Sequence, residues 1–258
     1  MARIFITGSA DGLGQLAARQ LVKQGHQVVL HARSPERAQE ARAAVPQAEV
    51  AVYGDLSTLA GMHQVAEQAN QLGRFDAVIH NAGLYQVPRL ILTADGLPPL
   101  LAVNSLAPYV LTCLIERPTR VVYLSSGMHR QGDASLQDLT WQDRPWNTTQ
   151  AYCDSKLHDL LLSNAVARHW AAVLANAVDP GWVPTKMGGI GAPDNLAEGA
   201  HTQAWLAAGD DPAAHLTGQY LHHQRPSAAH TQAADPAVQE HFLAEAARLT
   251  GVTLLNRP

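Results

Sequence analysis

Residues 3–16 read RIFITGSADGLGQL, and this stretch decides how the first part of the chain folds. The β-branched and aromatic residues 3–7 predict a strand, and the apolar spacing after Gly14 predicts a helix. Between them, Gly8, Gly12 and Gly14 allow a tight turn that can approach a pyrophosphate, which the free amides of a helix N-terminus stabilise. The spacing is neither Gly-x-Gly-x-x-Gly nor a P-loop, so by itself it leaves a purely structural turn open.

Short strands alternate with helices along the rest of the chain. Strands are predicted at residues 3–7, 27–32, 49–53, 75–80, 120–124, 175–178 and 219–221, and helices at residues 35–44, 58–72, 100–114 and 150–172. This alternation predicts an α/β fold with one doubly wound parallel sheet, a Rossmann-type fold, flanked by helices. No linker, charge run or repeat divides the 258 residues, so we expect a single domain over residues 1–258.

The composition of the chain indicates which kinds of ligand and which compartment to expect. The net charge of −4 supplies no field for nucleic acid, so a small-molecule substrate is expected. Cys113 and Cys153 are too few for a disulfide framework, and no signal-peptide pattern precedes the first strand, so we expect a cytoplasmic protein. None of the thirteen histidines has the spacing of metal ligands, and no metal is expected.

The uncharged segment 97–115 is almost long enough to cross a bilayer, but it contains three prolines and Asn104. We expect a buried helix and no membrane span. Pro108 lacks the N–H that would bond to the carbonyl of Asn104, so it predicts a kink and a carbonyl free to hold water. A proline tolerated in a bent core helix is the alternative. This helix and the one containing Tyr152 could pair in a homodimer or homotetramer, and a monomer stays open as well.

Several predicted strands end in residues suited to a dinucleotide, because ligands gather at the carboxyl ends of parallel strands. The second strand leads into Arg33 and Ser34 without a carboxylate, and an Arg here accommodates the 2′-phosphate of NADP(H). A surface cation without a ligand is the alternative. After the third strand, Asp55 suits either an adenine amino group or a helix cap. The fourth strand ends in Asn81-Ala82-Gly83, whose small residues let the backbone pass beside a dinucleotide.

Tyr152 and Lys156 are four residues apart, which places both on one face of a helix. A cation held close to a phenol stabilises the phenolate, so the pair can act as an acid and base near neutral pH. An exposed pair without a task is the alternative for an isolated match. The fifth strand ends in Ser125-Ser126, whose hydroxyls are expected at the same crevice.

Together these motifs resemble the short-chain dehydrogenase/reductase family over nearly the whole chain. The matching positions follow the family's order: Thr7-Gly-x-x-x-Gly-x-Gly14, Asp55, Asn81-Ala82-Gly83, Asn104, Ser126, Tyr152-x-x-x-Lys156 and Pro180-Gly181-x-Val183-x-Thr185. The chain looks most like the retinol-dehydrogenase-like and related bacterial oxidoreductases. His80, Asp179 and Lys186 depart from the residues frequent there and leave the substrate class open.

The resemblance implies a role for each matched residue. Tyr152 would be the acid and base, with a pKa lowered by Lys156, and Lys156 would also hold the nicotinamide ribose. Ser126 would bind the substrate oxygen, and Asn104 would anchor a water that links Lys156 to solvent. The residues expected to bind NADP(H) are Gly8, Ser9, Asp11, Gly12, Leu13, Gly14, Arg33, Ser34, Asp55, Leu56, Asn81, Ala82, Gly83, Tyr152, Lys156, Pro180, Gly181, Val183 and Thr185.

The sequence thus predicts an NADP(H)-dependent oxidoreductase that reduces a carbonyl or oxidises an alcohol on an apolar substrate. Residues 186–211, rich in glycine at their start, are expected to form a mobile substrate lid. Tyr85, Met128, Trp146 and Trp182 are candidates for an apolar pocket, with core packing as the alternative. A non-catalytic NADP(H)-binding sensor or scaffold is the alternative function. A dehydratase or epimerase shares the Tyr and Lys but usually needs a larger substrate domain.

Overall fold

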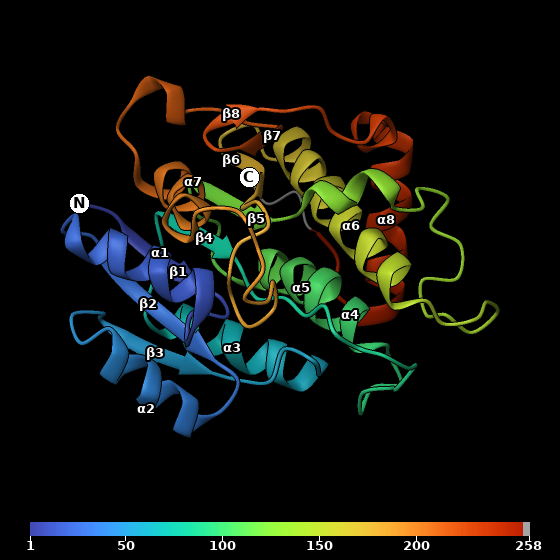
Figure 1. Cartoon of the computed structure of the whole chain (residues 1–258), viewed down its shortest axis with the longest axis horizontal. Coiled ribbons are helices and arrows are strands. Elements are labelled where there is room, and N and C mark those ends of the chain that lie inside the picture. Colours follow the sequence, from blue (N-terminus) through green and yellow to red (C-terminus); the bar gives the residue numbers. More distant parts are fainter. Residues whose placement is uncertain (255–258) are drawn as a thin grey trace.

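Eight strands form one sheet in the computed structural model, which describes residues 1–254 (Figure 1). Their order is β3-β2-β1-β4-β5-β6-β7-β8, and only β8 runs antiparallel to its neighbour. The strands are β1 (Arg3–Ile6), β2 (Gln27–Ala32), β3 (Val50–Tyr53), β4 (Ala77–His80), β5 (Arg120–Leu124), β6 (Leu174–Asp179), β7 (Gln219–His222) and β8 (Arg225–Pro226). The predicted fold class is confirmed, and the two-residue β8 is the one strand that the sequence did not indicate.

The strand order reverses at β1, which lies between β2 and β4. The chain builds one half of the sheet outward from β1 to β3, then returns to β4 and continues outward to β7. At such a reversal the loops after the two central strands diverge to opposite faces and leave a crevice. The glycine turn after β1 and residues 81–83 after β4 therefore meet at this point.

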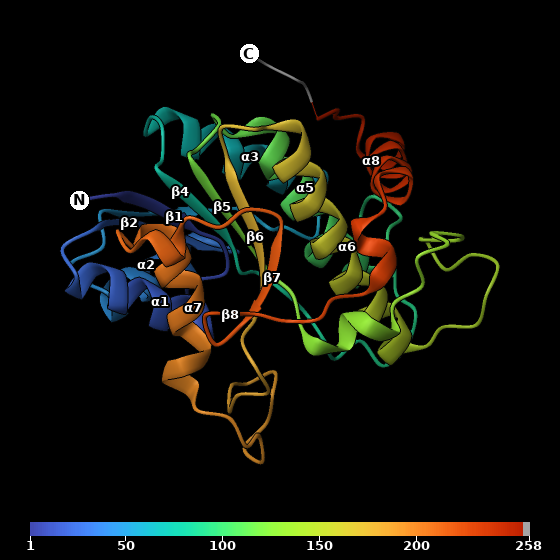
Figure 2. The same cartoon turned by 90° about the horizontal axis from the view of Figure 1, so that it is seen from above.

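Helices cover both faces of the sheet, as the view from above shows (Figure 2). On one face lie α1 (Gly12–Lys23), α2 (Pro35–Ala44) and α7 (Leu196–Ala208). The other face carries α3 (Leu59–Gln71), the short α4 (Pro99–Leu101), α5 (Ala107–Leu114) and α6 (Thr148–His169), and α8 (Pro236–Thr250) packs against α6. Both faces of the central strands are buried, as parallel sheets require.

The predicted helix 100–114 contains a π-helical segment, Ala102–Leu106, between α4 and α5. The N–H of Ala107 bonds to the carbonyl of Ala102, five residues back, just before Pro108 enters α5. The expected kink therefore takes the form of a π-bulge, and Asn104 lies inside it. Within residues 1–254, no helix combines the length and apolar character needed to cross a membrane.

Helix α7 falls within residues 186–211, the segment expected to form a lid. Its residues Ala200, Ala204 and Ala207 are buried, and the helix packs along α1. Asn195 begins the helix by accepting hydrogen bonds from the backbone N–H groups of Ala197 and Glu198. Only residues 186–195 and the short connection after α7 lie outside this packed helix.

Candidate active site

The glycine turn packs directly against residues 81–83. Gly8 has a φ of +61°, and a Cβ there would lie 2.7 Å from the Cα of Ala82. A Cβ on Gly14 would lie 2.5 Å from the Nδ2 of Asn81, which donates to the carbonyls of Thr7 and Gly8 at 3.0 Å each. The two motifs predicted from strand ends are therefore in contact.

His31, near the end of β2, is hydrogen-bonded to the glycine turn. Its Nδ1 accepts a hydrogen bond from the N–H of Gly8 at 2.9 Å, so its Nε2 is the atom that donates to the carbonyl of Gly54 at 3.0 Å. The side chain is buried, and burial lowers its pKa to about 4, so the ring is neutral. Sequence analysis did not single out His31. Ser9 is also buried: its hydroxyl donates to the carbonyl of Ile6, and its N–H donates to the carbonyl of His31.

The end of β2 carries Arg33, which is exposed, and Ser34, whose side chain caps α2. Nearby, the carboxylate of Asp11 pairs with Arg37 at 3.1 Å and with Lys186 at 2.8 Å. These exposed pairs contribute little to stability, but they place two cations beside the glycine turn.

Two further predicted cofactor residues follow β3. The carboxylate of Asp55 accepts a hydrogen bond from the N–H of Ser57 at 2.9 Å, a turn contact just before α3. Thr58, and not Asp55, accepts the cap bond from the first turn of that helix. The side chain of Leu56 is buried in the core, with 4% of its surface exposed.

Residues 180–185 cross above the glycine turn. The methyl group of Thr185 lies 4.0 Å from where a Cβ on Gly12 would stand. Gly181 has a φ of +79°, and a Cβ there would lie 2.6 Å from Asp194, which accepts the N–H of Trp182 at 2.6 Å. Asp194 thus fixes the Pro-Gly turn, and sequence analysis did not single it out.

Tyr152 lies in the crevice with Ser126 and Lys156. Its side chain is largely buried, and the ring of Tyr85 meets it edge-on with the centroids 4.7 Å apart. Ser126 lies close enough to the hydroxyl of Tyr152 to influence it, and the ammonium of Lys156 lies 5.8 Å from the centre of the tyrosine ring. Ser125 is turned away, since its hydroxyl donates to the backbone carbonyl of Lys156.

The pKa of Tyr152 is set by burial together with two nearby charges. Burial raises its pKa above the ordinary value, while Lys156 lowers it and Asp159 raises it further. The net direction is therefore upward, because removing the phenolate from water costs more than Lys156 returns. Lys156 thus acts on Tyr152 in the expected direction, but burial outweighs it.

Lys156 has two buried partners. Its ammonium donates to the carbonyl of Leu124 at 2.6 Å and to the carboxylate of Asp159 at 2.9 Å. Burial lowers the pKa of Lys156, but Asp159 and Tyr152 outweigh it and leave the pKa raised, so the lysine stays charged. Asp159 lies one turn later on α6 and is a third residue that sequence analysis did not single out.

The side chain of Asn104 fastens the segment after β4 to α6. Its Oδ1 accepts from the N–H of Leu84 at 2.7 Å, and its Nδ2 donates to the carbonyl of Leu84 and to the hydroxyl of Ser155. A Cβ on Gly83 would meet Asn104, Lys156 and Met187 at 3.6, 3.8 and 4.0 Å. A strip of small residues thus runs from the glycine turn to Lys156, which fits an extended dinucleotide.

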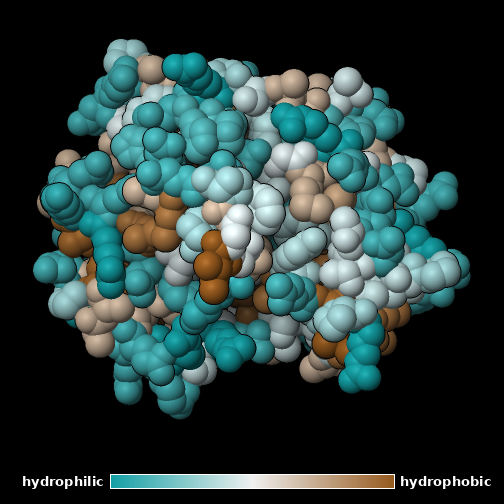
Figure 3. All heavy atoms as spheres, in the orientation of Figure 1, coloured by the Kyte–Doolittle hydropathy of each residue, from teal (hydrophilic) through white to brown (hydrophobic). Residues whose placement is uncertain are grey.

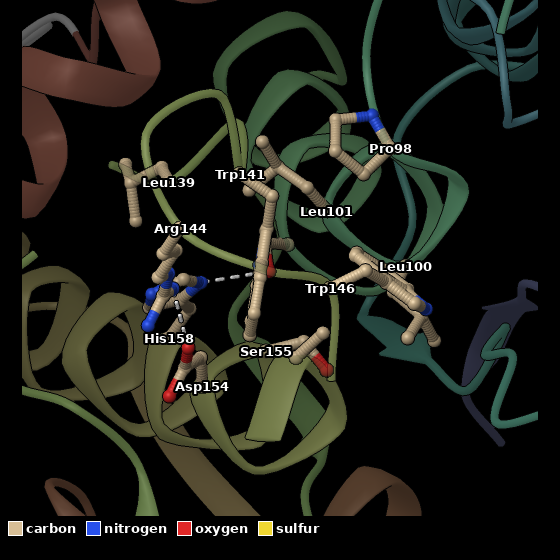
Figure 4. Close-up of a pocket in the computed structure, with 12 residues that line it drawn as sticks. Pro98, Leu100, Leu101, Leu139, Trp141, Arg144, Trp146, Asp154, Ser155 and His158 are labelled. Carbon is tan, nitrogen blue, oxygen red and sulfur yellow. Dashed lines mark hydrogen bonds and ion pairs between the residues drawn. The ribbon is translucent and has the colours of Figure 1, made fainter. Parts of the chain in front are cut away.

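Three of the four pocket candidates gather around Tyr152. Tyr85, Met128 and Trp146 pack against one apolar cluster that contains Tyr152, whereas Trp182 is 60% exposed and donates to the carbonyl of Gly188. On another side of α6 lies a small pocket lined by Trp141 and Trp146 (Figure 4). There Arg144 pairs with Asp154, and His158 bonds to Ser105.

Comparison with known proteins identifies the family. A model of the short-chain dehydrogenase family matches residues 2–135. An uncharacterised oxidoreductase of Emericella nidulans is 44% identical over 257 residues, which cover 98% of each chain. Human retinol dehydrogenase 13 is 28% identical over 284 residues, covering 96% of this chain and 84% of that protein. A crystal structure of an uncharacterised protein from Mycobacterium paratuberculosis superposes with a TM-score of 0.83 at 27% identity, covering 99% of this chain and 95% of that one.

The fold and the crevice define a nucleotide-binding oxidoreductase. The chain belongs to the short-chain dehydrogenase family, whose members bind a nicotinamide cofactor. The resemblance inferred from the motifs, including that to retinol dehydrogenases, is confirmed.

Proposed function

We propose that this protein reduces a carbonyl group, or oxidises an alcohol, on a small apolar substrate with NADP(H), and that Tyr152 is its acid and base. One observation carries the proposal: Tyr152, Ser126 and Lys156 meet in the crevice that also contains the glycine turn. The cofactor supplies or accepts the hydride when it is bound. The residues of this chain then have to bind the substrate oxygen and move one proton.

Tyr152 and Ser126 divide that work. The hydroxyl of Ser126 donates to the substrate oxygen and stabilises the negative charge that grows on it during reduction. The hydroxyl of Tyr152 gives its proton to the same oxygen, and in the oxidation direction the phenolate takes it back. The positive charge of Lys156 favours the phenolate and offsets part of the cost of its burial. The side chain of Asn104 bonds to Ser155 on α6. Its backbone carbonyl binds a water through which the proton given up by Tyr152 is replaced.

The choice of NADP(H) rests on the end of β2. Arg33 is exposed just after β2, and Arg37 on α2 pairs with Asp11 of the glycine turn. An Arg at this position accommodates a 2′-phosphate, whereas a carboxylate would repel it.

The apolar substrate class rests on what surrounds Tyr152. Its ring belongs to a cluster with Val87, Leu100 and Trp141. Large apolar residues are also exposed on the loops that follow β4 and β6: Leu84, Leu90, Ile91, Leu92, Trp182, Met187 and Ile190. The face drawn in Figure 3 is mostly hydrophilic, with its apolar residues in separate small patches. Apolar loops beside a crevice suit the entry of an apolar substrate, and we assign the lid to residues 186–195.

A panel of aldehydes, ketones and quinones tests the proposal. We expect NADPH oxidation, followed at 340 nm, with the fastest turnover on apolar carbonyl compounds. Tight NADPH binding without turnover on any member of the panel would contradict the proposal and favour a sensor or scaffold.

A further inference from the structure

Asp159 is the carboxylate in direct contact with the lysine of the proposed catalytic pair. It follows Lys156 by three residues on α6, and the side chains of the two residues are 2% and 6% exposed. The carboxylate lies 2.9 Å from the ammonium, which donates its other bond to the carbonyl of Leu124 at 2.6 Å. With two of its three protons committed to these partners, the ammonium is held in one place and keeps one proton for the crevice.

The groups that face this pair come from several elements. Tyr152 lies on α6 itself, and the ring of Tyr85 covers it from the loop after β4. From β5, Tyr123 is buried and lies close enough to Asp159 that the carboxylate adds to burial in raising its pKa. From β6, the carboxylate of Asp179 acts on Tyr152. Asp179 has its own partners, since it accepts hydrogen bonds from the hydroxyl of Tyr220 and the N–H of Gly181.

An ammonium and a carboxylate in contact act on a third group as a dipole. A lone buried lysine would favour the Tyr152 phenolate strongly, whereas an adjacent carboxylate cancels much of that effect. The geometry therefore gives Asp159 two consequences for Tyr152: it fixes the position of the positive charge, and it limits how much of that charge the phenol experiences.

We propose that Asp159 is a positioning residue that anchors the Lys156 ammonium against Leu124 and sets how strongly Lys156 acidifies Tyr152. The consequence for catalysis rests on the proposed function. Asp159 then determines the pH at which the Tyr152 phenolate forms, and so the pH range in which alcohol oxidation is fast.

Asp159→Asn tests the proposal, since an amide oxygen still accepts the lysine N–H but carries no charge. The protein is labelled with 13Cζ-tyrosine, saturated with NADP+ and titrated by NMR up to the alkaline limit of the native fold. Tyr152→Phe identifies the resonance. We expect the Tyr152 resonance to begin titrating about one pH unit lower in the Asn variant. An unchanged or raised midpoint would overturn the proposal.

Asp154→Asn is the matched control. It also removes a buried carboxylate from α6, but Asp154 pairs with Arg144 on a different side of the helix (Figure 4). We expect the Tyr152 midpoint in the Asp154 variant to equal that of the wild type. An equal shift in both variants would contradict the proposal, because it would show that any lost negative charge on α6 has the same effect. Asp159→Glu keeps the charge and should leave the midpoint close to that of the wild type. If Asp159→Asn does not fold, Asp159→Glu is measured instead. A shift of its Tyr152 midpoint by one pH unit would contradict the proposal.

The NMR measurement separates the two proposals. If a substrate is found, the pH dependence of kcat/KM for oxidation should move by the same amount as the resonance, while a purely structural role would lower kcat without moving the profile. If no substrate is turned over but the resonance shifts, the proposed function fails and the role of Asp159 stands.

Discussion

The N–H of Gly8 donates to the Nδ1 of His31 at 2.9 Å, which joins the turn after β1 to the end of β2. Because the Nε2 of the same ring donates to Gly54 after β3, one neutral imidazole connects the ends of three neighbouring strands. Protonating Nδ1 would remove its only acceptor site and bury a charge. The shape of the glycine turn therefore depends on an uncharged His31.

Buried neutral histidines predict loss of stability in acid. Burial lowers the pKa of His31 and His158 to about 4 and that of His80 to about 3. Between those values and roughly 6.5 the unfolded chain binds more protons than the folded one, so stability falls as the pH is lowered through this range. Each histidine costs on the order of 3 kcal/mol by pH 4.

Asp159 opposes this trend, since burial raises its pKa to about 6, and its folded-state protonation regains roughly 2 kcal/mol over the same range. We expect urea unfolding to give a free energy several kcal/mol lower at pH 4.5 than at pH 7, and His158→Gln to reduce that difference. His201→Gln, at an exposed position, should not change it. Stability independent of pH in this range would contradict the prediction.

Gly14→Ala should destabilise the protein although alanine normally favours a helix. The added methyl group would lie 2.5 Å from the Nδ2 of Asn81 and 2.6 Å from the carbonyl of Gly8. Moving the Asn81 side chain and the Gly8 carbonyl should cost about 1–3 kcal/mol and weaken NADPH binding, as measured by thermal unfolding and fluorescence titration. Gly191→Ala is the matched control because a Cβ there meets nothing within 4 Å.

Tyr152→Phe should lower turnover by a factor of about 10² or more, because it removes only the proton that is transferred. The affinity for NADPH should stay within a few-fold of the wild type, since the ring and its contact with Tyr85 remain. Steady-state kinetics and a cofactor titration measure the two quantities. Near-normal turnover would show that another residue is the acid.

Arg33→Asp should weaken NADPH binding far more than NADH binding. A carboxylate at the end of β2 repels a 2′-phosphate and accepts a hydrogen bond from a ribose hydroxyl. Isothermal titration with both cofactors measures the ratio, which should change by at least tenfold. Arg225→Asp makes the same exchange at an exposed position on β8 and should leave the ratio unchanged. Equal losses for both cofactors in the Arg33 variant would remove the basis for NADP(H).

Helix α8 predicts a monomer, where the sequence left homodimers and homotetramers open. It packs along α6, with Phe242 buried and stacked on His158 at 4.9 Å between ring centroids. The face of α6 that α8 covers is therefore closed to a partner helix. Light scattering should give the mass of one chain at micromolar concentration, and a stable dimer would contradict this interpretation.

The contact between the glycine turn and residues 81–83 was predictable because both segments follow strand ends. In a parallel sheet those ends share one edge, so the order of motifs in the sequence translates into proximity in space. Gly8, Asn81 and Thr185 are close together for this reason.

The supporting residues depend on neighbours that are distant in the sequence. His31 and Asp194 act on backbone groups that only the folded chain brings near them. The Lys156–Asp159 pair could have been predicted, because a carboxylate three residues after a lysine lies on the same face of a helix. Its burial depends on how the sheet and the neighbouring helices enclose α6. The start of α7 could also have been predicted, because Asn195 followed three residues later by Glu198 is typical of a helix N-terminus. The glycines before Asn195 favoured a flexible segment instead.

Asp194 and Trp182 bond to each other twice, since each accepts a hydrogen bond from the other's backbone N–H. This clasp closes residues 182–194 into a loop with its own base, outside the sheet and ahead of α7. At the tip of this loop Ile190 is fully exposed and a Cβ on Gly191 would meet nothing within 4 Å, so residues 190–191 can be exchanged or extended without disturbing the sheet. Natural variation or protein engineering can therefore alter this loop, and with it the preference for substrates, while the sheet and its glycine turn stay the same.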